Sequence, residues 1–403
     1  MSNDPALAHM HNFLRMMLEK KASDLFISAD FPVAMKIDGK MTPLSQQKLT
    51  GEHTRAFAYA LMSEKQRLEF DKEKECNFAI WPKDIGRFRV NVFVQQENVG
   101  MVLRTITTKI PRFDDLGLPV ILKEVMQSKR GLIILVGGTG SGKSTTLAAL
   151  IDYRNENSYG HIITIEDPVE YVHTSKNCLI THREVGRDTL DWFPALKNTL
   201  RQAPDVILIG EIRDRETMEF ALAFAETGHL CMATLHANSA NQALDRIINF
   251  FPEERHAQLH MDISLNLRAF ISQRLVPKKG GGRCAAIEIL LNSPLVADLI
   301  LKGETNQVKE AMAKSVELGM QTFDQALFNL CEEGRITRED ALRNADSINE
   351  LRLKFKLHSK ESKVDAGESR PAFSILEEPK PEPEKKKDES PPGLVTGVIP
   401  KKP

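Results

Sequence analysis

The sequence predicts an α/β protein in which a small mixed domain precedes a larger domain built on a parallel sheet. Three short apolar runs at residues 132–136, 161–165 and 206–209 are separated by helical stretches, which is typical of buried parallel strands. A glycine-rich segment at 137–144 joins the first run directly to a helical stretch. We therefore expect a nucleotide-binding type of sheet in the larger domain.

Composition excludes several classes of protein. The 403 residues are 41% hydrophobic, which is enough for two cores, and Lys+Arg 54 against Asp+Glu 55 leave a formal charge of -1. No overall basic field draws the chain to nucleic acid, so we expect no nucleic-acid partner. The five cysteines form no CxxC pair, which argues against a zinc ribbon and suits the cytosol. No run approaches the roughly 18 apolar residues of a membrane span, so none is expected.

The first predicted domain covers residues 1–110. Asp4 and Pro5 suit the start of a helix, and a core-facing stripe is a commoner explanation for its apolar side than membrane binding. The stripe consists of Leu7, Met10, Leu14, Met17 and Leu18. Runs at 24–28, 33–37 and 86–93 predict strands, another strand ends near Ile106, and Asp38-Gly39 predicts a turn.

Two prolines and a glycine mark residues 111–119 as an interdomain linker, and a helix is predicted to start near Val120. The second domain is predicted at 120–355. After about Glu361 prolines, lysines and glutamates dominate, and eight of the 20 prolines lie between Pro371 and Pro403. We predict that the tail, 356–403, is disordered, since this composition cannot bury a core.

The glycine-rich segment GGTGSGKS matches the phosphate-loop pattern GxxxxGK[ST] in the required context of strand, loop and helix. Its backbone N–H groups and the following helix N-terminus would cradle a polyphosphate, so ATP with Mg²⁺ is the predicted ligand. Lys143 is expected to reach the β- and γ-phosphates and Ser144 to hold Mg²⁺. The predicted binding residues are Gly137, Gly138, Thr139, Gly140, Ser141, Gly142, Lys143, Ser144 and Thr145.

Acidic residues follow two of the predicted parallel strands, at the edge where α/β sheets bind ligands. Glu211 follows the strand 206–209 and is our candidate for the metal side of the site, acting through water. Glu166 and Glu170 follow the strand 161–165, and either could position or deprotonate the attacking water. A helix-capping role is an equally good explanation for each acid taken alone.

With these residues in place, the chain resembles the secretion ATPases that power type IV pili and type II and IV secretion. The resemblance covers about residues 1–355 and rests on four motifs in the family's order. They are the phosphate loop, the Asp box TIEDPVE at 164–170, the Walker B run ending GEIRD at 210–214, and the His box TGHLCMATLHANSA at 227–240. The His box is the most specific of the four.

The resemblance implies a PAS-like N-terminal domain, a RecA-like P-loop ATPase core and a homohexameric ring. It selects Glu170 over Glu166 as the catalytic acid, and it places His229 and His236 near the nucleotide. Two N-terminal arginines, Arg89 and Arg104, would reach the phosphates in the manner of arginine fingers. Without the resemblance, a solvated strand face is the simpler explanation for both arginines.

Within the family, the short N-terminal region and the lack of a four-cysteine insertion resemble the pilus retraction branch, the PilT/PilU type. Residues 293–302 depart from the AIRNLIRE-like segment of PilT-type motors, which makes the PilU type the closer match. The resemblance implies an accessory retraction motor, cytoplasmic and peripheral at the inner-membrane pilus base. Its implied partners are a PilT-type ATPase and a platform protein. The alternatives are a traffic ATPase for pilus extension or secretion, and a weakly hydrolysing subunit that binds a partner ring.

Overall fold

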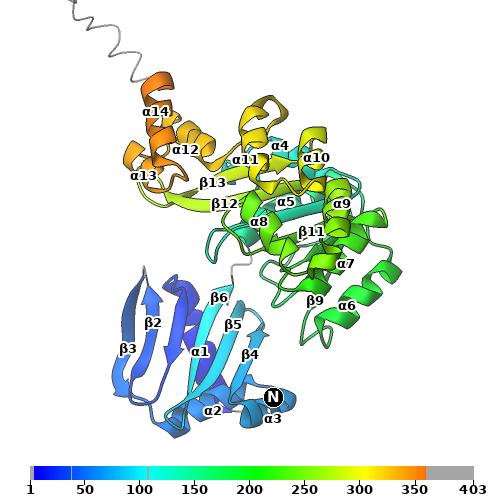
Figure 1. Cartoon of the computed structure of the whole chain (residues 1–403). Coiled ribbons are helices and arrows are strands. Elements are labelled where there is room, and N and C mark those ends of the chain that lie inside the picture. The colour runs from blue at the N-terminus through cyan, green and yellow to red at the C-terminus, as the bar shows by residue number, and fades with distance from the viewer. Residues whose placement is uncertain (1–3, 38, 107–108, 360–403) are drawn as a thin grey trace, which may run out of the picture.

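The computed structural model describes residues 4–37, 39–106 and 109–359, which form two sheets with their covering helices (Figure 1). The first sheet has six strands and the second has seven. They lie on either side of the predicted linker, which itself contains a short 3-10 turn at Asp114–Leu116. The α/β class is confirmed. In the part of the chain that is described, no helix is long and apolar enough to cross a bilayer.

The N-terminal sheet is antiparallel throughout, in the order β3-β2-β1-β6-β5-β4. Its elements are α1 (Pro5–Glu19), β1 (Asp24–Ile27), β2 (Pro32–Ile37), β3 (Lys40–Lys48), α2 (Gly51–Leu61), α3 (Glu64–Glu73), β4 (Glu75–Ile80), β5 (Arg87–Gln95) and β6 (Asn98–Ile106). Gly39, with φ +80°, lies between β2 and β3 where the turn was predicted, and Asp38 is outside the described residues.

Helix α1 begins as predicted, because the Asp4 carboxylate accepts a hydrogen bond from the backbone N–H of Ala6 at 2.9 Å. Met10, Leu14 and Met17 are fully buried against the sheet. Leu18 is 38% exposed, so the buried stripe is narrower than the sequence predicted.

Strand alternation separates the two faces of this sheet. Phe88, Val90 and Val92 of β5 enter the core beneath α1–α3, whereas the alternate residue Arg89 is exposed on the opposite face. That face is the one that meets the second domain.

The second sheet has the order β13-β12-β7-β11-β10-β8-β9, and only β13 runs antiparallel to its neighbour. Its strands and helices are α4 (Ile121–Met126), β7 (Gly131–Val136), α5 (Lys143–Asn157), β8 (Gly160–Glu166), β9 (Cys178–Glu184), α6 (Trp192–Thr199), β10 (Val206–Ile209), α7 (Arg215–Glu226), β11 (Leu230–Leu235), α8 (Ala240–Ile248), α9 (His256–Asn266), β12 (Leu267–Pro277), β13 (Arg283–Leu291), α10 (Pro294–Leu301), α11 (Thr305–Lys314), α12 (Phe323–Glu332), α13 (Arg338–Arg343) and α14 (Ile348–His358). The predicted buried parallel sheet is confirmed.

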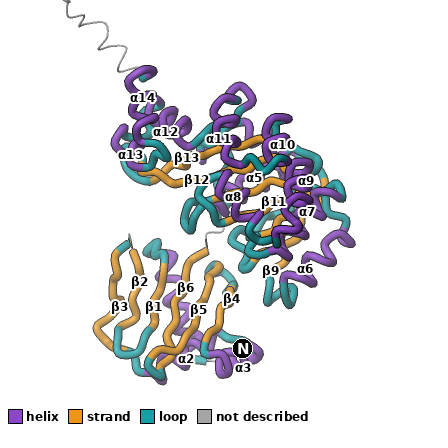
Figure 2. Tube along the Cα trace, viewed as in Figure 1, coloured by secondary structure: helices purple, strands orange, loops and turns teal. Residues whose placement is uncertain are grey.

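Helices cover both faces of this sheet (Figure 2). Leu132, Ile134 and Val136 of β7 pack against the core that α7, α8 and α9 complete, while Ile133 and Leu135 pack against α4 and α5. Burial on both faces explains why the central strands are continuously apolar.

The predicted start of the tail at 356 is wrong. Helix α14 continues to His358, and Phe355 inside it is 2% exposed because it packs among α12–α14. The rest of the predicted tail, 360–403, lies outside the described residues.

Candidate active site

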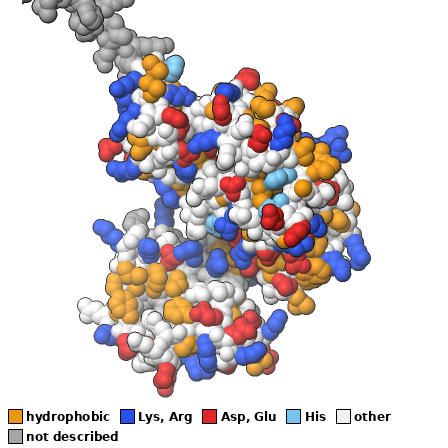
Figure 3. All heavy atoms as spheres, viewed as in Figure 1, with side chains coloured by type: hydrophobic (Ala, Val, Ile, Leu, Met, Phe, Trp, Pro, Cys, Tyr) orange, Lys and Arg blue, Asp and Glu red, His pale blue; other side chains and the backbone are white. Residues whose placement is uncertain are grey.

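A cavity of about 590 Å³ lies at the carboxyl edge of the parallel sheet, between the phosphate loop and the N-terminal sheet. Lys and Arg side chains are visible along both sides of the hollow between the two domains (Figure 3). The charged residues that line the cavity are Arg89, Arg104, Lys143, Glu166, Asp167, Glu170, Glu211, Arg213 and Arg283. Thr139, Gly140, Ser141, Gly142, Lys143, Ser144 and Thr145 supply the loop side.

The phosphate loop needs glycine at two positions where the backbone turns left-handed. Gly140 has φ +75° and Gly142 has φ +89°. A Cβ on Gly142 would also lie 2.7 Å from Nε2 of Gln273, whereas Gly140 faces open space. Gly137 and Gly138 do not line the cavity, and their carbonyls face inward to Lys143.

Gln273 of β12 fastens the loop to the sheet. Its amide oxygen accepts a hydrogen bond from Oγ1 of Thr146 at 2.7 Å, and its Nε2 donates to the carbonyl of Ser141 at 2.8 Å. Oγ of Ser141 is buried and has no hydrogen-bond partner among the described residues. The loop is therefore folded and held, while one buried hydroxyl is left without a partner in the described structure.

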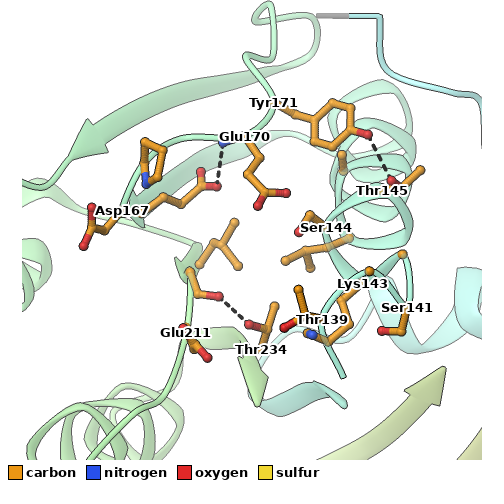
Figure 4. Close-up of a pocket in the computed structure, with 18 of the residues that line it drawn as sticks. Thr139, Ser141, Lys143, Ser144, Thr145, Asp167, Glu170, Tyr171, Glu211 and Thr234 are labelled. Carbon is orange, nitrogen blue, oxygen red and sulfur yellow. Dashed lines mark hydrogen bonds between the residues drawn. The ribbon is translucent and has the colours of Figure 1, made fainter. Parts of the chain in front are cut away.

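Lys143 occupies the interior of the loop (Figure 4). Its Nζ donates to the carbonyls of Gly137 at 2.7 Å and Gly138 at 3.1 Å. Burial lowers the pKa of Lys143, and the nearby carboxylates of Glu211 and Glu170 oppose that change. Among the described residues no carboxylate is bonded to this cation, which suits a residue that binds an anionic ligand.

The two acids after β8 lie in different surroundings. Burial raises the pKa of Glu166 to about 7, and its Oε2 lies 3.5 Å from the backbone N–H of Glu170. Glu170 is exposed, and its carboxylate points into the cavity toward the phosphate loop (Figure 4). Glu170 is therefore open to ligand and water, whereas Glu166 lines the same cavity but is partly buried.

Glu211 is held by an arginine and a histidine. It accepts from Nε of Arg213 at 2.6 Å, and it lies 2.7 Å from Nε2 of His236. His236 lines the cavity as the resemblance implied. Arg213 stands in the quoted GEIRD run, but a single arginine after a strand gave no reason to assign it to the site.

His229 is not one of the cavity residues of this chain. It precedes β11, at the amino end of the strand, while the phosphate loop lies at the carboxyl end. Its Nδ1 lies 3.1 Å from Oγ1 of Thr227, beside the end of α7. Strand direction thus separates His229 from His236, although both belong to one motif.

The two arginines of the N-terminal sheet lie directly opposite each other on β5 and β6 and both line the cavity. Nε of Arg104 donates to Asp24 at 2.8 Å while its side chain stays 68% exposed. Arg89 has no ion pair within the described residues and is exposed. Both guanidinium groups can accept an anionic partner.

Oxygen donors from both edges of the cavity fit a Mg²⁺ ion that arrives with a nucleotide. Ser144, Glu211 and Glu170 line one cavity, and no group of three or more His, Cys, Asp or Glu within the described residues could hold a metal alone. Mg²⁺ generally keeps waters and phosphate oxygens as ligands, so one hydroxyl and a nearby carboxylate suffice.

Three further features were not predicted. The hydroxyl groups of Tyr171 and of Thr145 in the loop form a hydrogen bond of 3.0 Å, and Arg283 of β13 lines the cavity. Arg87 forms a buried ion pair with Glu184 of the second domain. Strand alternation could have indicated Arg87, because it shares a face of β5 with Arg89.

With this geometry described, known proteins can be compared. The family described as type II/IV secretion system protein matches residues 2–342. The type IV pilus ATPase PilU of Pseudomonas aeruginosa is 60% identical over 353 residues, which are 87% of this chain and 92% of that protein. The type IV pilus retractation ATPase PilT of the same organism is 43% identical over 332 residues, 82% of this chain and 96% of that protein.

Solved structures are similar as well. The crystal structure of the pilus retraction motor PilT with bound ADP has a TM-score of 0.79 and 42% identity, covering 85% of this chain and 98% of that one. The ATPase DotB of Legionella pneumophila has a TM-score of 0.71 and 26% identity, covering 83% and 93%. The chain therefore belongs to the type II/IV secretion system protein family. Within that family it is a pilus ATPase of the PilT/PilU type.

Proposed function

We propose that this chain hydrolyses ATP in the cavity described above and uses the energy to power type IV pilus retraction and twitching motility. Its similarity to PilU and PilT supports the motor function. The observation that carries the chemistry is that one cavity gathers the phosphate loop, acids that follow β8 and β10, and arginines of the N-terminal sheet.

The loop binds the phosphates of ATP, and Lys143 exchanges its carbonyl partners for phosphate oxygens. When bound, Mg²⁺ neutralises phosphate charge, and Ser144 with Glu211 would hold it, Glu211 through water. Glu170 orients the attacking water and accepts its proton. Arg89 and Arg104 stabilise the charge on the phosphates as the domains close.

Glu166 lines the same cavity as Glu170 and could support this chemistry. A carboxyl group whose pKa is raised to about 7 can hold or release a proton near neutral pH. Glu166 is therefore the second candidate for the proton acceptor. His236 contacts Glu211 and would respond to a change at that carboxylate.

A comparison of Glu170→Gln with Glu166→Gln tests the assignment. Glu170→Gln should reduce kcat on the order of 100-fold or more while nucleotide affinity is kept, because general-base catalysis commonly contributes that much. Glu156→Gln is the control, since this exposed glutamate of α5 pairs with Lys176 outside the cavity. Normal turnover by Glu170→Gln together with a large loss in Glu166→Gln would move the base to Glu166.

We further propose a homohexameric ring that works as an accessory motor beside a PilT-type ATPase, in the cytoplasm at the inner-membrane pilus base. The 60% identity to PilU and the segment at 293–302, which contains all of α10 and departs from PilT-type motors, support this assignment. The implied mechanical partner is the platform protein of the pilus.

Imaging pili in deletion strains tests the cellular role. Loss of this chain should weaken retraction and leave the cells piliated, and this chain alone should not replace a deleted PilT-type motor. Bald cells after its deletion would instead assign it to pilus extension.

A further inference from the structure

The buried contact between the two domains lies directly behind the acid loop, which we define as residues 166–171. Arg87 and Glu184 form an ion pair in which both side chains are about 95% buried, at 4% and 5% exposure. Arg87 starts β5 in the N-terminal sheet, and Glu184 ends β9 at the edge of the parallel sheet. This ion pair takes no part in the mechanism above.

One oxygen of Glu184 serves both domains. Its Oε2 accepts from the guanidinium of Arg87 and also from the backbone N–H of Val169, the latter at 3.1 Å. Val169 is 2% exposed and immediately precedes Glu170. The carboxylate that binds the N-terminal domain is therefore the group that fixes the backbone next to the proposed base.

The backbone of Glu184 is held in place by hydrogen bonds. Its backbone carbonyl accepts from Asp188 at 2.8 Å, and its backbone N–H donates to the Asp188 carboxylate at 2.9 Å. The next N–H, that of Val185, donates to the carbonyl of Glu166 at 2.9 Å. Because these hydrogen bonds hold the backbone around Glu184, a displacement of its carboxylate would also displace the Val169 N–H that it binds, and with it the acid loop.

The same strand face supplies both interdomain cations. Arg87 and Arg89 are two residues apart on β5, so any movement that withdraws Arg89 from the cavity also withdraws Arg87 from Glu184. Arg87 is the only cation paired with Glu184 among the described residues, and a buried carboxylate without a cation is strongly disfavoured. Nε of Arg87 has no partner in the described structure, so the ion pair on Glu184 is its main anchor.

We propose that Glu184 is a positioning residue that makes hydrolysis depend on docking of the N-terminal domain. With Arg87 docked, Glu184 holds Val169 and Glu170 is set toward the phosphates. When the domain moves away, the carboxylate loses its cation and releases the acid loop. The inference rests on the proposed role of Glu170.

The test measures turnover and local backbone protection in the full-length chain. Arg87→Met removes the cation and keeps the length of the side chain. It should lower kcat on the order of 10- to 100-fold, because small displacements of a catalytic group have effects of that size. The ATP dissociation constant should stay unchanged, since neither Arg87 nor Glu184 lines the cavity. Hydrogen–deuterium exchange of a peptide covering 166–171 should become faster.

Two further variants separate positioning from general destabilisation. Glu184→Gln keeps an oxygen for the Val169 N–H but loses the charge that holds Arg87, and Arg87→Lys keeps the charge without the planar fork. For both variants, kcat and the rate of hydrogen–deuterium exchange at 166–171 should lie between the values of wild type and of Arg87→Met. Arg55→Met is the matched control, because Arg55 makes an exposed ion pair with Asp71 in the same domain.

The outcomes are distinct. Wild-type kcat in folded Arg87→Met, or faster exchange with no change in kcat, would overturn the proposal. If Arg87→Met does not fold, folded Glu184→Gln gives the same decision by the same two measurements. Normal turnover by Glu170→Gln would instead remove the proposed base, and the exchange data would still show whether Glu184 fixes the loop.

Discussion

The two walls of the cavity are built differently. The phosphate loop is held before any ligand arrives, with Gln273 bonded to both sides of it and Lys143 satisfied by two carbonyls. The opposite wall presents Arg89, which is exposed and without an ion pair in the described structure, and Arg104, which has one anchor. The phosphate-loop wall is ready to bind phosphate, whereas the arginine wall still has N–H donors without a partner in the described structure.

This difference indicates that the loop wall provides the preformed binding site, while the two arginines of the other domain add to the rate enhancement that Glu170 and Lys143 provide. A preformed loop gives ground-state affinity, whereas a contact that forms mainly on domain closure stabilises the transition state more than the open complex. Substitution of either arginine should therefore slow hydrolysis more than it weakens ATP binding.

The largest effect is expected on the loop wall. Lys143→Ala should abolish ATP turnover, because it removes the flexible cation able to follow the γ-phosphate. Phosphate release from the purified chain measures this, and Lys197→Ala, an exposed lysine of α6, is the control. Unchanged phosphate release by Lys143→Ala would rule out the site.

A smaller effect is expected on the arginine wall. Arg89→Ala and Arg104→Ala should each slow hydrolysis about 10-fold or more while nucleotide binding changes less, since arginine fingers act on the transition state. Arg→Lys at either position should not restore the rate, because an ammonium lacks the bidentate fork. Steady-state kinetics together with nucleotide binding by fluorescence would separate the two constants.

The competing explanation is that both arginines only solvate a strand face. It predicts wild-type rates in both alanine variants with unchanged assembly. That result would remove the interdomain mechanism and leave the loop assignment intact.

The smallest effect concerns stability. The pKa of Glu166 is raised from 4.5 to about 7 by burial, so between these values the folded chain keeps a proton that the unfolded chain has lost. Stability from this group is therefore lost as pH rises from about 4.5 to 7. Glu166→Gln cannot titrate, so its stability relative to wild type should rise over that window, on the order of 2 kcal/mol. Thermal unfolding at pH 5 and 8 measures the difference, and a pH-independent difference would contradict it.

The sequence predicted the loop wall well because its signal is local. Strand, glycine turns, lysine and helix follow one another within 132–157, and each element depends on its neighbours. Central strands such as β10 were equally clear, since burial on both faces leaves an unbroken apolar run.

Contacts between distant segments could not be predicted in the same way. Gln273 meets Thr146 across 127 residues, and Arg87 meets Glu184 across 97. Edge strands gave a weak signal as well. Nearly every residue of β3 is exposed, and β9 is only partly buried, so neither shows a clear apolar pattern.

The attachment of the phosphate loop to β12 depends on the amide of Gln273. Its oxygen accepts from Thr146 and its nitrogen donates to the Ser141 carbonyl, so the two ends of the amide are not interchangeable. Deamidation to glutamate would keep the first contact and set a carboxylate oxygen against a carbonyl oxygen in the second. Such a change of one side chain would loosen the loop from β12 without any change in the motif that defines the ATP site.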